Sequence, residues 1–273
     1  RHVQKQYIFQ PKSVTAYAKR LLLRIGLYRA LAIDTTQEQF EEILKSEFAD
    51  EKIYLVKNAV NVDVFKLEET KQEKTPSDYA SQFMVGYIGG VPKLRGAVML
   101  INTLKALRKK IPHYRVLIVG DSKYKNESHV DDLKKLAKEK GVLDYVTFTG
   151  FVPYNEVPSF MQEIDCGVAL WPSEDAKRFG NSSQKIYQYI ATGSPVIIPN
   201  DCHTDLEELE IGYGIDSDDQ KAFIRTVESV YNKFLNGDVR AGGVAELANR
   251  YSTDQRAQLQ YSIWKKAFKK DII

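Results

Sequence analysis

Two segments of the chain combine glycine, serine and basic residues in patterns that could bind anions. In the first, Gly89 and Gly90 follow an apolar run, and Lys93 and Arg95 come shortly before a helical pattern. Glycine lets a phosphate approach the backbone closely, and the free N–H groups at a helix start favour negative charge. The glycine spacing differs from the dinucleotide-binding fingerprint, so phosphate binding and plain turn chemistry both stay open.

The second segment surrounds the start of a helix expected over residues 184–191. Ser182 or Ser183 can cap this helix, and Lys185 and Gln188 lie in its first turns. One interpretation is an ordinary capped crossover helix. The other is a second helix N-terminus facing the same ligand, and two such helix starts suit a diphosphate better than a single phosphate.

The elements that must position these residues follow a regular alternation. Apolar runs with little polar alternation indicate strands buried on both faces, and amphipathic patterns between them indicate helices. The predicted strands are 83–88, 114–119, 146–149, 166–170 and 195–198, and the predicted helices are 97–110, 129–140, 155–162, 184–191 and 218–235. This order predicts an α/β fold with a doubly wound, Rossmann-like parallel sheet.

Glycines stand at three of the predicted strand ends. They are Gly89, Gly120 and Gly150, and Phe151 and Val152 follow the last of them. Ligands of parallel sheets bind at the carboxyl ends of the strands, so these glycines are expected to converge on one crevice.

Charge is concentrated near the start of the chain. The 273 residues carry a net charge of +3, too little to indicate a nucleic-acid partner, yet residues 1–33 hold seven basic side chains and no acidic one. A basic helix predicted over residues 11–31 can pack on a domain as a surface helix or lie on an anionic membrane. The chain opens on Arg1, and we expect it to begin partway through a larger protein.

The sequence gives little support for a membrane-spanning segment or for disulfide bonds. No run of about 18 apolar residues occurs, and the two cysteines, Cys166 and Cys202, suit a reducing compartment. We therefore expect a cytoplasmic protein, with peripheral contact at the inner face of the membrane as a further option. Residues 63–81, with Pro76 and many charges, form the predicted linker.

Residues 58–231 resemble the donor-binding half of the group 1 (family 4) retaining glycosyltransferases, which have the GT-B fold. The similar segments, in family order, are NAVNVDVF at 58–65, GGVPKLRG at 89–96, LIVGD at 117–121, VTFTGFV at 146–152 and QKIYQYIATGSPVI at 184–197. The resemblance implies transfer of a sugar from a nucleotide-diphosphate donor to a glycan or lipid-linked acceptor, with retention. It also implies no cofactor and no metal at the donor.

The resemblance assigns roles to individual residues. Arg95 and Lys185 match basic residues that contact the diphosphate and are the implied catalytic residues. Together with the two anion-binding segments, the resemblance gives these predicted donor-binding residues: Gly89, Gly90, Lys93, Gly120, Phe151, Val152, Ser182, Ser183 and Gln188. The chain departs from the family where Gly90 replaces an arginine and Gln188 replaces a glutamate that holds the donor ribose.

The resemblance also divides the chain. Residues 1–62 would be the end of an N-terminal acceptor-binding domain, 82–250 the donor-binding domain, and 251–273 a helix that crosses back to the first domain. Two alternatives stay open: a non-catalytic relative that binds nucleotide or glycan, and a sugar-nucleotide epimerase or phosphorylase of the same fold. A nicotinamide dehydrogenase is disfavoured because the glycine fingerprint is missing.

Overall fold

The computed structural model describes residues 14–66, 74–90, 96–121, 123–124, 127–171, 183–200, 204–239 and 241–270. Three residues expected in the site, Lys93, Arg95 and Ser182, lie outside these ranges, as does Cys202. Every helix of the described ranges falls short of the length and apolarity that a bilayer crossing requires.

A six-stranded parallel sheet forms the centre of the larger part of the molecule, which we call the sheet domain. Neighbouring strands are hydrogen-bonded to each other in the order β10 (Gly212–Ile215), β9 (Val196–Pro199), β8 (Cys166–Val168), β3 (Phe83–Ile88), β4 (Tyr114–Val119) and β7 (Val146–Gly150). All six residues of β3 are buried, as expected for a strand covered on both faces. The predicted α/β fold with a doubly wound sheet is thus confirmed.

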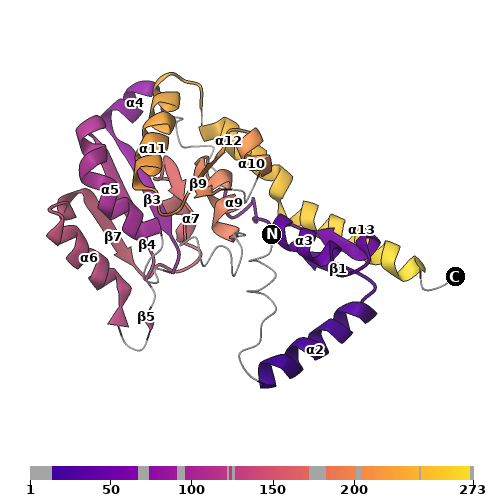
Figure 1. Ribbon diagram of the computed structural model, residues 1–273. Helices are drawn as coiled ribbons and strands as arrows, with labels where there is room; N and C mark the ends of the chain where they lie inside the picture. Colours follow the sequence, from indigo (N-terminus) through magenta and orange to yellow (C-terminus); the bar gives the residue numbers. More distant parts are fainter. Residues whose placement is uncertain are drawn as a thin grey trace.

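Helices cover both faces of the sheet (Figure 1). One face carries α4 (Pro76–Ser81), α5 (Gly96–Lys110), α6 (His129–Glu139) and α11 (Gln220–Leu235), and the other carries α7 (Val157–Met161), α9 (Gln184–Ala191), α10 (Thr204–Glu208) and α12 (Ala241–Leu247). Each layer has its own apolar core. Leu104 and Phe223 lie in the first core, and Ile186 and Ile198 in the second.

The winding of the sheet reverses between β3 and β8. The chain runs from β3 through β4 to β7 on one side, and then returns to place β8 on the other side of β3. The carboxyl ends of two strands at such a switch point are where open parallel sheets bind their ligands. We therefore expect the ligand site among the residues that follow β3 and β8.

A smaller group of elements, the small lobe, lies beside the sheet domain in Figure 1. It comprises α2 (Val14–Arg29), β1 (Ile33–Thr35), α3 (Glu38–Lys45), the 3-10 turn η1 (Asp50–Lys52), β2 (Ile53–Leu55) and the long helix α13 (Thr253–Lys270). β1 and β2 pair in parallel, and Gln260 on α13 donates a hydrogen bond to Asp34. The division of the chain into domains stays a prediction.

Several elements differ from the expectation. The segment expected to be a linker contains α4, which begins with Pro76 after a capping box of Thr75 and Asp78 and buries Tyr79. The elements α10, β10 and α12 were not predicted. The remaining short elements are the hairpin of β5 (Lys123–Tyr124) and β6 (Glu127–Ser128) and the 3-10 turns η2 (Leu143–Tyr145) and η3 (Ala248–Tyr251).

Candidate functional site

Three glycines meet at the carboxyl edge of the sheet, as the sequence predicted. The Gly89 N–H donates to the Val119 carbonyl at 3.0 Å, and the Gly120 N–H donates to the Gly150 carbonyl at 2.9 Å. All three glycines have positive φ, and a Cβ atom on Gly120 would lie 2.4 Å from the Gly89 oxygen. At position 120, only glycine fits this close approach of backbones. We call these three residues the glycine edge.

Helix α9 reaches the same edge from the second core. The Lys185 Nζ atom lies 3.4 Å from the carbonyl oxygen of Ile88, the residue before Gly89. The two segments that suggested anion binding, near residues 90 and 185, therefore lie together, although the chain separates them by 97 residues from Ile88 to Lys185.

Aromatic rings surround the Lys185 ammonium group. Its Nζ atom lies 3.9 Å from the centroid of the Tyr87 ring and 5.9 Å from that of Trp171. Such cation–π contacts hold a charge in place without neutralising it. The Tyr87 hydroxyl in turn donates to the Gly90 carbonyl at 2.9 Å, so one ring contacts both the glycine turn and the lysine.

The other predicted site residues occupy different environments. Ser183 is at the N-cap position of α9, as expected, but its side chain makes no capping hydrogen bond. Gln188 is 7% exposed, one turn after Lys185. Phe151 is 80% exposed directly after Gly150, whereas Val152 packs against the second core. Gly89, Gly90, Gly120, Lys185 and the Phe151 backbone thus share the edge.

Tyr189 is a residue of this edge that our reasoning from sequence did not single out. Its side chain is fully buried, and its hydroxyl accepts a hydrogen bond from the Ile88 N–H at 2.8 Å and donates to the Gly86 carbonyl at 3.2 Å. Burial raises the pKa of Tyr189 well above its ordinary value, so the hydroxyl keeps its proton. Its position four residues after Lys185 is the signal that could have identified it.

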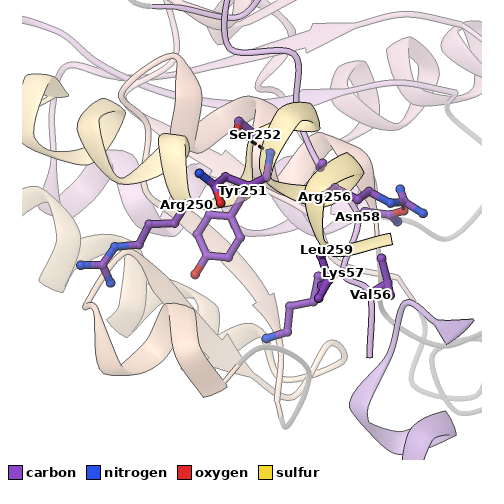
Figure 2. Close-up of a pocket in the computed structure, with 10 residues that line it drawn as sticks. Val56, Lys57, Asn58, Arg250, Tyr251, Ser252, Arg256 and Leu259 are labelled. Carbon is purple, nitrogen blue, oxygen red and sulfur yellow. Dashed lines mark hydrogen bonds between the residues drawn. The ribbon is translucent and has the colours of Figure 1, made fainter. Parts of the chain in front are cut away.

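A separate cavity of about 320 Å³ lies where the chain crosses between the small lobe and the sheet domain (Figure 2). It is lined by residues from two segments, 56–59 and 250–259. Arg250 and Arg256 point in different directions in Figure 2, and Arg256 donates to the Asn58 side chain at 3.3 Å. The cations around this cavity therefore do not converge as those of an anion site would.

Lys57, at the same crossing, is bound by two carboxylates. Its Nζ atom lies 2.8 Å from Asp205 Oδ1 and 2.9 Å from Glu38 Oε1. Burial disfavours the charged form of Lys57, but the hydrogen bonds to Asp205 and Glu38 outweigh it and raise the pKa of the ammonium group. Tyr251 completes the cluster by donating to Asp205 Oδ2 at 2.7 Å.

Fold and edge together define a parallel α/β domain whose switch point combines close-packed glycines with a lysine. Comparison with known proteins then gives the family. The family model described as Glycosyl transferases group 1 matches residues 82–233, more than half of the chain. The chain therefore belongs to the group 1 glycosyl transferases, as the sequence motifs indicated.

Individual relatives agree with this assignment. The 2-deoxystreptamine glucosyltransferase of Streptomyces kanamyceticus is 24% identical over 205 residues, which are 71% of this chain and 50% of that protein. A GDP-mannose-dependent alpha-(1-6)-phosphatidylinositol monomannoside mannosyltransferase of Mycobacterium tuberculosis is 36% identical over 69 residues, 25% of this chain and 16% of the relative. The chain thus spans about half the length of the first relative.

A solved structure shares the fold. The Anabaena protein HepE, in complex with UDP and glucose, superimposes with a TM-score of 0.67 at 16% identity, over 93% of this chain and 68% of that one. At this identity the likeness shows the fold, and the GT-B architecture expected from the sequence is confirmed.

Proposed function

We propose that the protein transfers a sugar from a nucleotide-diphosphate donor, and that the glycine edge and Lys185 hold the donor's diphosphate. The observation that supports this most directly is the 3.4 Å contact between Lys185 and the strand end that leads into Gly89. It places a cation beside a turn without side chains, and a diphosphate needs both features.

The chemistry follows from where charge develops. When the bond between the sugar and the diphosphate breaks, negative charge accumulates on the leaving phosphate oxygens. Preorganised cations and N–H groups stabilise that charge best when they need not move during the reaction. Lys185 is held over the Tyr87 ring, and the resemblance adds Arg95 as a second cation and assigns retention of configuration.

Two proteins found in the comparisons support parts of this proposal. HepE was solved with UDP and glucose, which favours a nucleotide-sugar donor. The Mycobacterium relative is named for a GDP-mannose donor and a phosphatidylinositol-linked acceptor, which favours a glycan or lipid-linked acceptor. In this proposal Phe151 and Val152 face the base, and Gln188 hydrogen-bonds the ribose.

The test is calorimetric titration of the full-length native protein with UDP and with GDP, followed by turnover with the corresponding sugar nucleotides. Lys185→Ala is expected to lower kcat about 100-fold, as the loss of one charge-stabilising donor typically does. Lys138→Ala, an exposed lysine on α6, is the matched control and should leave turnover unchanged. If the wild-type protein binds neither nucleotide, the proposal is wrong.

A second candidate function is binding without catalysis, and Gly90 and Gln188 are the reason for it. The family's arginine and glutamate are missing at these two positions. If the protein binds nucleotide but does not turn it over, Gly90→Arg combined with Gln188→Glu should produce activity. If the wild type is already active, the same substitutions should change the rate little.

We also propose peripheral contact of the small lobe with an anionic membrane. On α2 the side chains of Leu22, Leu23 and Ile25 are 69%, 59% and 46% exposed, and the basic residue Arg29 is exposed beside them. Each basic side chain near anionic lipid contributes about 1 kcal/mol. Sedimentation with phosphatidylglycerol vesicles should exceed that with phosphatidylcholine and should weaken with salt. Equal sedimentation with both lipids would contradict the proposed membrane contact.

A further inference from the structure

Helix α9 holds the end of strand β3 through two side chains one turn apart. The Ile88 N–H donates to the Tyr189 hydroxyl at 2.8 Å, and the Ile88 carbonyl accepts from Lys185 at 3.4 Å. The pairing of β3 with β8 covers only Val85 and Gly86, so it ends before Ile88. The side chains of α9 therefore replace the missing strand partner at the switch point of the sheet.

The tyrosine ring is fixed between two neighbours. Its hydroxyl also donates to Gly86 at 3.2 Å, which ties it to β3 at a second point. On the β8 side, a Cβ atom at Gly167 would lie 2.4 Å from the Tyr189 ring, so the glycine there makes room for the ring. Because the side chain is fully buried in a close-packed interior, the Tyr189 hydroxyl is held in a single position.

The position of Ile88 determines the position of the glycine turn. Gly89 follows it directly and contacts Gly120 so closely that no side chain fits between them. The next residue, Gly90, is held by the Tyr87 hydroxyl at 2.9 Å. A shift of the strand end would therefore move the turn away from the Lys185 ammonium group, which is carried by the helix and not by the strand.

We propose that Tyr189 is a positioning residue for the donor site. Its hydroxyl fixes the end of β3 to α9, so that the glycine turn and Lys185 keep one spacing for the diphosphate. This inference rests on the proposed function. Because Tyr189 is fully buried, it acts through Ile88 and does not touch the donor.

The experiment uses the full-length native protein with UDP and GDP as calorimetric probes. Tyr189→Phe keeps the ring and removes the hydroxyl, which leaves the Ile88 N–H buried without its acceptor. Since a buried unsatisfied group costs enough to shift a local equilibrium severalfold, we expect the Kd for the nucleotide to rise about 10-fold. Gly167→Ala should push the ring from the other side and raise the Kd in the same direction.

Two control variants separate positioning from general stability. Tyr114→Phe removes a fully buried hydroxyl that has no hydrogen-bond partner in the described part of the chain, at the opposite end of the sheet, and should leave the Kd unchanged. Leu107→Ala removes core volume in α5. It should lower the midpoint of thermal unfolding more than Tyr189→Phe does, without raising the Kd.

The outcomes distinguish this inference from the proposed function. Wild-type protein that binds neither nucleotide refutes the proposed function. In that case, amide hydrogen exchange still tests whether Tyr189 anchors the end of β3. Tyr189→Phe should speed the exchange of the Ile88 amide hydrogen, and an unchanged exchange rate would overturn the anchoring role. If the wild type binds and Tyr189→Phe binds equally well, or if Leu107→Ala weakens binding as much, the positioning role is wrong.

Discussion

The ammonium group of Lys57 lies 2.8 Å from the carboxylate of Asp205, and this ion pair joins the first crossing of the chain to helix α10 of the sheet domain. A second contact of 2.9 Å to Glu38 joins the same lysine to helix α3 of the small lobe. The Lys57 side chain therefore contacts both the small lobe and the sheet domain. Because the Lys57 side chain is only 21% exposed, water screens these pairs less than it screens surface pairs.

Replacement of Lys57 by methionine should destabilise the fold. The change removes the Lys57 ammonium group from the carboxylate of Asp205, whose Oδ1 atom is buried, and the loss of a partner from a partly buried pair costs about 2 kcal/mol. Urea unfolding followed by circular dichroism gives the free energy. Lys45→Met is the control, because the Lys45 side chain is 40% exposed and water screens its pairs with Glu41 and Asp50 more strongly, so its loss should leave the midpoint unchanged.

Gly120→Ala should disrupt the glycine edge. Its φ of 107° is strained for alanine, and the new methyl group would lie 2.4 Å from the Gly89 oxygen, which is backbone and cannot move aside cheaply. We expect a loss of about 2 kcal/mol or more in the free energy of unfolding, together with weaker nucleotide binding. Gly26→Ala, where a Cβ atom meets open space within a helix, should not destabilise the protein. Equal effects of the two variants would contradict the close approach.

The N-cap of helix α11 leads to a prediction about the stability of the fold at acidic pH. The carboxylate of Asp219 accepts hydrogen bonds from the Ala222 and Lys221 N–H groups, and the bond from Ala222 contributes most to lowering the pKa of Asp219 below its ordinary value. A group with a lowered folded-state pKa stabilises the fold above its unfolded-state pKa, and this contribution disappears as the pH falls through the folded-state pKa. Asp219→Asn should therefore narrow the difference in melting temperature between pH 7 and pH 3. Asp218→Asn is the control, because Asp218 is the neighbouring residue outside the cap position. If Asp218→Asn narrowed the difference in melting temperature equally, the pH dependence would not come from the cap.

The sheet could be predicted from sequence because its strands are buried on both faces. The run 83–88 is buried throughout, the run 114–119 is apolar apart from the exposed Arg115, and both strands have the bounds that were expected. β10 was missed because it has four residues, Gly212–Ile215, two of which are glycines. Glycine weakens the local preference for strand, so β10 depends on its pairing with β9.

The candidate site was predictable in its composition and not in its internal contacts. The convergence of Gly89, Gly120 and Gly150 follows from a general property of parallel sheets. The bond between Tyr189 and Ile88 does not, because it depends on β8 separating from β3 after Gly167, a packing detail set by side chains far apart in the chain. The residue types in a motif indicate which chemistry is possible. The hydrogen bonds that fix the spacing of those residues are tertiary contacts between distant parts of the chain, and a motif does not contain them.

The two crossings of the chain between small lobe and sheet domain are themselves hydrogen-bonded to each other. The Val60 N–H donates to the Tyr251 carbonyl at 2.9 Å, and the Thr253 N–H donates to the Val60 carbonyl at 3.0 Å. Two connections that are bonded to each other resist rotation of the small lobe about the chain more than a single connection would. The alignment of the small lobe with the sheet domain therefore depends on both crossings together.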